Sequence, residues 1–272
     1  MAKKKRLKRV SEKSLKSLLS KKSILSSKSE GISKEKLKIV RVPTGIPGFD
    51  KLIEGGVEVN SVNLVVGGSG TGKTIFSTQF LIEGLKRGES CLFVTFEETK
   101  SEFYSNAYTF GWDLAEYEKK NKFFFLEYSP EKVMAMLEEG GGEIESIVTK
   151  YNIKRLAMDS VSSFALLFND ELAKRESALV LFEMIRRWNV TSLLTLQEDA
   201  EARTVGYTTS LEFEADSIIL LYFIRYKGER KRFVEVLKMR GTNHSTKTYP
   251  IIIGKHGVIM GSEILKEELS AK

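Results

Sequence analysis

Residues 67–74 read Gly67-Gly68-Ser69-Gly70-Thr71-Gly72-Lys73-Thr74, and this stretch decides the fold. It matches the pattern G-x-x-x-x-G-K-[ST], in which backbone N–H groups wrap phosphates and the lysine neutralises their charge. Residues 61–66 are typical of a buried strand, and residues 74–84 of a helix whose N-terminus faces the phosphates. We therefore predict a P-loop in which residues 68–74 bind ATP and Thr74 ligates Mg²⁺.

A second ligand for Mg²⁺ is expected at the carboxyl end of a buried strand, where ligands collect in open α/β sheets. The segment Arg155-Leu156-Ala157-Met158-Asp159-Ser160 provides one. Asp159 is therefore predicted to orient Mg²⁺ together with Thr74. The alternative is an aspartate that only ends its strand and caps the next turn.

Hydrolysis also requires a group that orients or deprotonates water. Glu97 and Glu98 directly follow the predicted strand 91–96, so they lie at the same edge of the sheet as the P-loop. Thr99 and Glu102 form a capping-box pattern, and glutamates just ahead of a helix are also favoured electrostatically. The residues alone leave both interpretations of Glu97 and Glu98 open.

Two cations end the predicted strand 233–239. Lys238 and Arg240 differ by two positions, so they project from the same face of an extended segment. Together they would be able to grip a γ-phosphate as an arginine finger does. The alternative is a solvated strand end, and His244 is interpreted as a turn residue.

Strand-like and helix-like segments alternate from Ile39 onward, which predicts a mostly parallel central sheet flanked by helices. After residue 213 only strands follow, which predicts an antiparallel β extension at the C-terminal end. The fold class is therefore α/β with a P-loop. Strands are expected at 62–66, 91–96, 123–126, 155–159, 191–195, 217–226, 232–239, 248–253 and 258–260, and helices at 72–87, 99–110, 131–138, 143–151 and 171–188.

The basic charge of the chain is concentrated at its start. The net charge is +7, but residues 1–38 alone hold 14 Lys and Arg against 3 Asp and Glu, which leaves −4 for residues 39–272. We predict a disordered basic tail over 1–38, an ATPase domain over 39–262 and a flexible tail over 263–272. The basic tail is either only solvated, or an arm that binds nucleic acid, or an anchor to a membrane or protein.

The chain is expected to be a soluble cytoplasmic protein. Its longest apolar run, residues 218–224, is far too short to span a bilayer, and no apolar segment of a signal peptide follows the basic start. The single cysteine, Cys91, lies in an apolar run and is predicted to be a buried hydrophobic residue.

Taken as a set, the motifs resemble the KaiC family of RecA-like ATPases, in its single-domain, archaeal form. The resemblance covers about residues 39–262. It rests on the P-loop and on Pro43-Thr44-Gly45-Ile46-Pro47-Gly48-Phe49-Asp50-Lys51-Leu52, Thr95-Phe96-Glu97-Glu98, Phe110-Gly111-Trp112-Asp113-Leu114, Met158-Asp159-Ser160 and Leu237-Lys238-Met239-Arg240-Gly241-Thr242.

This resemblance implies a ring, usually a hexamer, with ATP bound between neighbouring subunits. It implies that Glu97 and Glu98 are the catalytic glutamates, and that Lys238 and Arg240 reach the γ-phosphate across the interface. Gln197 resembles the RecA-type glutamine that senses the γ-phosphate. The expected function is a Mg²⁺-dependent ATPase that acts as a regulator or motor.

The sequence departs from the clock proteins of the family in two ways. It contains one such domain, not two in tandem, so a clock role does not transfer. Glu212-Phe213 stand where the self-phosphorylated Ser-Thr pair is expected, and Thr208-Thr209-Ser210 are out of register, so autokinase activity does not transfer either.

Two other functions compete with a ring ATPase. One is a DNA-binding recombinase paralogue in DNA repair, although the loops expected to approach DNA, 160–170 and 198–212, are acidic on balance. The other is a switch that binds ATP without hydrolysing it and controls assembly of another machine. The sequence assigns no adenine contacts.

Overall fold

A computed structural model describes residues 39–129, 132, 135–137, 140–165, 170–198, 214–226 and 228–261. The tails predicted at 1–38 and 263–272 and the segment Thr208-Thr209-Ser210 lie outside these residues. The strands are β1 (Arg41–Val42), β2 (Val57–Glu58), β3 (Val62–Gly67), β4 (Ser90–Thr95), β5 (Phe123–Glu127), β6 (Ile153–Asp159), β7 (Thr191–Gln197), β8 (Ser217–Tyr226), β9 (Glu229–Met239), β10 (Tyr249–Gly254) and β11 (Gly257–Met260). The helices are η3 (Asp50–Ile53), α2 (Lys73–Lys86), α3 (Lys100–Thr109), α4 (Leu114–Lys119), α6 (Gly142–Tyr151), α7 (Val161–Ala165) and α8 (Glu171–Arg187).

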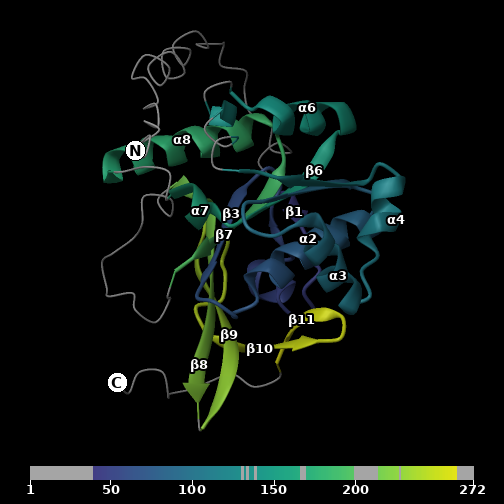
Figure 1. Ribbon diagram of the computed structural model, residues 1–272. Helices are drawn as coiled ribbons and strands as arrows, with labels where there is room; N and C mark the ends of the chain where they lie inside the picture. The colour runs from purple at the N-terminus through teal and green to yellow at the C-terminus, as the bar shows by residue number, and fades with distance from the viewer. Residues whose placement is uncertain are drawn as a thin grey trace, which may run out of the picture.

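Nine strands form one central sheet in the order β11-β10-β9-β8-β3-β7-β6-β4-β5 (Figure 1). The strands from β8 to β5 in this order are parallel, whereas β9, β10 and β11 add antiparallel pairs at one edge. The predicted fold class, a mostly parallel sheet with an antiparallel C-terminal extension, is confirmed. Since parallel strands end at a common edge, the carboxyl ends of β3, β4, β6 and β7 come together.

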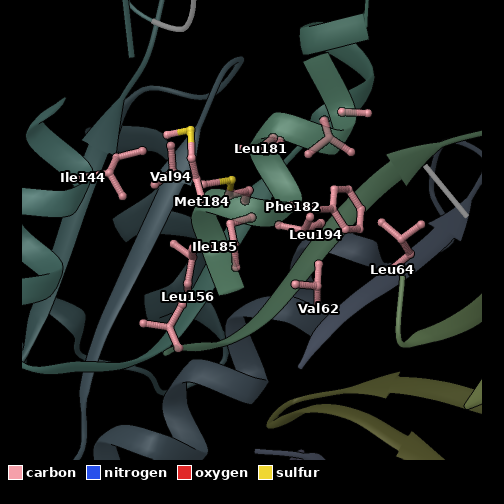
Figure 2. Close-up of a cluster of buried hydrophobic side chains, with 14 of the residues drawn as sticks. Val62, Leu64, Val94, Ile144, Leu156, Leu181, Phe182, Met184, Ile185 and Leu194 are labelled. Atoms are coloured by element: carbon pink, nitrogen blue, oxygen red, sulfur yellow. The ribbon is translucent and has the colours of Figure 1, made fainter. Parts of the chain in front are cut away.

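The parallel strands β3, β4, β6 and β7 are buried on both faces of the sheet, as parallel strands between helix layers must be. Figure 2 shows one face, where Leu64 and Leu194 pack with Phe182 and Ile185 of α8. On the other face, a second cluster joins Val65 to the aromatic side of α2 and to α3. Successive residues of β3 therefore point to opposite cores, and every residue of β3 is buried.

Most predicted elements are present with small changes at their ends, and Cys91 is buried as predicted. The two-residue strands β1 and β2 and the short helices η3, α4 and α7 were not predicted, because such short elements carry no hydrophobic period. Strand β9 begins at Glu229, three residues earlier than predicted. The charged residues 229–231 hide this start, which only pairing with β8 reveals.

Part of the helix predicted at 131–138 lies outside the described residues, and the described ones, 132 and 135–137, are helical.

No helix in the described ranges is long and apolar enough to cross a membrane.

A buried arginine on β6 hydrogen-bonds to α2, to the residue just before β4 and to the segment that follows β1. The side chain of Arg155 on β6 is fully buried; Nε donates to Glu89 Oε2 at 2.5 Å, and Nη1 donates to the carbonyls of Pro43 at 2.7 Å and Phe80 at 2.9 Å. The guanidinium also lies 4.7 Å from the ring centroid of Phe80. This arginine therefore supplies donors to one buried and one partly buried carbonyl group.

Replacing Arg155 by alanine should destabilise the fold by about 3 kcal/mol, because it removes an ion pair and leaves two carbonyl acceptors without donors. Urea unfolding followed by circular dichroism measures this change. The neighbouring Lys154, whose side chain is exposed, serves as control, and Lys154→Ala should change stability by less than about 0.5 kcal/mol. Equal unfolding midpoints for the two variants would contradict the structural role of Arg155.

Candidate nucleotide-binding site

The P-loop connects the carboxyl end of β3 to the first turn of α2. Gly70 and Gly72 have φ of 76° and 101°, in the left-handed region that favours glycine. A Cβ at Gly67 would lie 2.4 Å from the carbonyl oxygen of Leu221, so β8 also requires glycine there. Thr71 Oγ1 closes the loop by donating to the Gly68 carbonyl at 2.9 Å. The loop is therefore shaped by its own glycines and by its sheet neighbour.

The lysine of the motif folds back over the loop. Lys73 Nζ donates to the carbonyls of Gly67 at 2.8 Å and Gly68 at 3.0 Å. Burial lowers the pKa of Lys73, while the negative charges of Asp159 and Glu97 act in the opposite direction. A phosphate in the loop would supply a further negative charge beside this amine and favour its charged form.

Asp159 lies next to the P-loop, where the sequence predicted a magnesium ligand. Thr74 Oγ1 donates to Asp159 Oδ2 at 2.5 Å, and Thr195 Oγ1 donates to the other oxygen, Oδ1. A hydroxyl and a carboxylate are hard oxygen donors, the kind that Mg²⁺ selects. The donor set therefore fits Mg²⁺, with Thr195 fixing the orientation of the carboxylate.

Glu97 and Glu98 point toward the same edge of the sheet. Glu97 accepts hydrogen bonds from Ser160 Oγ at 3.1 Å and Ser163 Oγ at 2.5 Å, whereas Glu98 accepts one from Asn106 Nδ2 at 2.7 Å. Burial raises the pKa of Glu98, and the Asn106 hydrogen bond opposes that shift. Both carboxylates are thus held in place by neutral donors.

The capping box predicted for this segment is present, and it consists of Thr99 and Glu102. Thr99 Oγ1 accepts from the backbone N–H of Glu102, and Glu102 Oε2 accepts from that of Thr99 at 3.2 Å. Thr99 and Glu102 therefore cap α3 without help from the two preceding glutamates.

A hollow of about 1150 Å³ joins these groups. Its lining includes the P-loop, Glu97, Glu98, Asp159 and Gln197 at the strand ends. Ser105, Asn106 and Thr109 of α3, Arg232 of β9 and Ile253 of β10 also line it. The sequence pointed to none of these five, because they come from a helix face and from strands that only the fold brings to the P-loop.

Gln197 ends β7 beside the P-loop, where its backbone N–H donates to Ser162 Oγ at 2.5 Å. Its side chain is exposed and lines the hollow. This location suits a group that contacts the terminal phosphate.

Lys238 and Arg240 do not line the hollow of their own chain. They lie at the end of β9 that pairs with the start of β8, since Met239 is opposite Ser217, whereas the P-loop residue Gly67 is level with Leu221. Four residues of strand separate these levels, roughly 13 Å. Arg240 Nη1 lies 3.2 Å from Asp216 Oδ1. Burial and the nearby charge of Arg240 lower the pKa of Lys238.

Comparison with known proteins identifies the family. The family model described as the KaiC ATPase matches residues 42–264. The chain belongs to the KaiC family of ATPases. It is an ATP-binding protein of the RecA-like type, as the motifs predicted.

Similar proteins support this assignment. The KaiC-family chain is 34% identical over 230 residues to the circadian clock protein KaiC3 of Synechocystis sp., covering 82% of this chain and 46% of that protein. It is 33% identical to the circadian clock oscillator protein KaiC of Synechococcus elongatus, with 81% and 44% covered. The chain thus spans about half the length of these relatives. A KaiC-like protein from Pyrococcus horikoshii OT3 has a crystal structure that matches with a TM-score of 0.73 at 37% identity, covering 82% of this chain and all of that one.

Lys73→Ala should abolish nucleotide binding, because the phosphates lose the buried cation of the loop. Wild-type protein should be stabilised by about 2.7 kcal/mol when Mg·ATP is present at a hundredfold excess over its dissociation constant. A thermal-shift titration measures the effect. Lys86→Ala, at the exposed end of α2, is the matched control and should keep the full shift. An undiminished shift in Lys73→Ala would contradict this assignment.

Proposed function

We propose that this KaiC-family protein hydrolyses ATP to ADP and phosphate at sites shared between copies of the chain in a ring, usually a hexamer. The observation that carries the proposal is the separation of the charged groups. The P-loop, the two glutamates and Asp159 gather in one hollow, whereas Lys238 and Arg240 lie at the far end of β9. In a ring, Lys238 and Arg240 of one copy would therefore serve the hollow of a neighbouring copy.

Residues 68–74 would hold the phosphates, with backbone N–H groups and the Lys73 amine facing them. Thr74 and Asp159 would ligate Mg²⁺, which when bound neutralises charge on the β- and γ-phosphate oxygens. The hydrogen bond from Thr195 keeps the Asp159 carboxylate aimed at this position. Gln197 is proposed to contact the γ-phosphate.

Glu97 is proposed to orient the attacking water and accept its proton, with Glu98 as a supporting carboxylate. Glu97 lies close enough to Lys73 for its charge to raise the pKa of that amine, which supports a role beside the phosphates. Water would attack the γ-phosphorus as the bond to the β–γ bridging oxygen breaks, which gives ADP and phosphate. Glu98, bonded to Asn106, joins this edge to the first helix after β4.

Lys238 and Arg240 are proposed to contact the γ-phosphate of the neighbouring subunit. Burial and then the nearby charge of Arg240 lower the pKa of Lys238. An approaching phosphate would therefore stabilise both charges, as arginine fingers do in related phosphoryl transfers. The relatives from Synechocystis sp. and Synechococcus elongatus are named circadian clock proteins; we do not extend that role to a chain that matches about half their length.

Glu97→Gln should lower the rate of phosphate release at least a hundredfold while ATP binding persists, because the substitution removes the proton acceptor but preserves shape. Glu98→Gln should have a smaller effect, about tenfold. Steady-state phosphate release at saturating Mg·ATP measures both. The control is Glu116→Gln on the exposed side of α4. A wild-type protein that releases no phosphate, or a fully active Glu97→Gln variant, would refute the ATPase proposal.

A mixture of Lys73→Ala and Arg240→Ala chains should recover part of the activity that each variant lacks alone. In a mixed ring, the intact P-loop of one chain meets the intact Arg240 of its neighbour. Lys73→Ala mixed with the Lys73→Ala Arg240→Ala double variant is the control, since no intact P-loop is present. Phosphate release that stays at the level of this control would contradict shared sites.

A further inference from the structure

A ribbon of basic residues lies against the outer side of the P-loop. β8 and β9 form a long antiparallel pair (Figure 1), in which Phe223 is opposite Arg232 and Arg225 is opposite Arg230. Because directly opposite residues share a face, these four side chains lie on one face of the ribbon. Like charges directly opposite each other are unfavourable, so the Arg225–Arg230 pair needs a compensating partner.

The ribbon supplies no such partner. Along the chain from Arg225 to Arg230, the acidic residue is Glu229. It lies on the opposite face of the ribbon, and its carboxylate is 3.9 Å from Lys231 Nζ. Arg230 is instead placed over the ring of Phe223, 5.3 Å from its centroid. Within the part of the chain that the structure describes, no ion pair joins Arg225 or Arg230 to a carboxylate.

These two arginines open onto a second hollow of about 540 Å³. Its wall is the side of the P-loop that faces away from the nucleotide hollow, with Gly68 and Thr71, and it also includes Glu198. Of the residues that the structure describes, Ser69 and Gln197 line both hollows. The hollows therefore meet where the P-loop and the end of β7 approach each other, beside the location proposed for the terminal phosphate.

Arg232, on the same face of the ribbon, belongs to the nucleotide hollow. Its Nε donates to the Gly70 carbonyl at 2.8 Å, and its guanidinium is 4.1 Å from the centroid of Phe223. Among the residues that the structure describes, the charged side chains that line the second hollow are Arg225, Arg230 and Glu198, so its net charge is positive.

We propose that the second hollow is an anion site that takes inorganic phosphate as it leaves the hydrolytic site, with Arg225 and Arg230 as its ligands. Planar guanidinium groups match the oxygens of a phosphate, and two on one face can bind it together. Ser69 and Gln197 line both hollows, so the site adjoins the position proposed for the γ-phosphate. The role in product release rests on the proposed ATPase function, whereas phosphate binding itself does not.

Equilibrium binding tests the site independently of turnover. The full-length chain is loaded with Mg²⁺ and a non-hydrolysable β,γ-imido ATP analogue, which fills the P-loop, and radiolabelled inorganic phosphate is then titrated. We expect one phosphate per chain, with affinity at least tenfold weaker in Arg225→Gln and in Arg230→Gln, because each loses a charge-assisted hydrogen bond. Lys231→Gln, on the opposite face of the ribbon, should bind within about twofold of wild type.

Failure to bind phosphate in the loaded wild-type chain, or binding unchanged in the Arg225→Gln Arg230→Gln double variant, would overturn the proposal. A short oligodeoxynucleotide is titrated in parallel, since its backbone carries the same phosphate chemistry. Oligonucleotide binding that depends on these arginines, without binding of inorganic phosphate, would assign the hollow to nucleic acid and also overturn it.

Pre-steady-state kinetics test the role in release. In the double variant, phosphate detected by a fluorescent phosphate sensor should lag behind ATP cleavage measured by quenched flow, with a delay absent from wild type and from Lys231→Gln. Equal lags would overturn the exit role. If wild-type protein cleaves no ATP, the ATPase proposal fails, while the equilibrium titration still decides whether the anion site exists.

Discussion

The hydrogen bond from Thr74 to Asp159 links the two parts of the sequence on which the nucleotide site depends. It joins the first turn of α2 to the end of β6, 85 residues away along the chain. The contact is possible because β3 and β6 are parallel strands of one sheet and end at the same edge. The same edge carries Glu97 after β4 and Gln197 after β7. Parallel topology therefore assembles the site from segments that are distant in sequence.

The antiparallel extension has the opposite consequence. Strand β9 runs back along β8, so its carboxyl end, with Lys238 and Arg240, is carried away from the P-loop. Its other end brings Arg230 and Arg232 toward the loop. Strand β9 thus has cations at both ends: Arg230 and Arg232 lie beside the P-loop of their own chain, and Lys238 and Arg240 lie away from it. This division is the physical reason for treating the site as incomplete in a single chain.

Sequence patterns were sufficient for the core of this structure. The P-loop is a contiguous motif, and Asp159, Glu97 and Gln197 follow apolar strands, so their common edge follows from the α/β pattern alone. The burial of Arg155 was not predictable, because its partners are main-chain carbonyls that no side-chain pattern reports. The Arg225–Arg230 pairing was also missed, because the second strand was predicted to begin only at residue 232, so that Arg230 lay outside it.

Completion of each ATP site by a neighbouring chain is the central claim, and dilution tests it most directly. Phosphate release per chain should be measured over a range of protein concentrations, with the mass of the particle determined by sedimentation at each one. We predict that turnover per chain falls together with the fraction of chains in rings, because separated chains lack Lys238 and Arg240 at their P-loops. Monomers that hydrolyse ATP as fast per chain as rings would contradict this account.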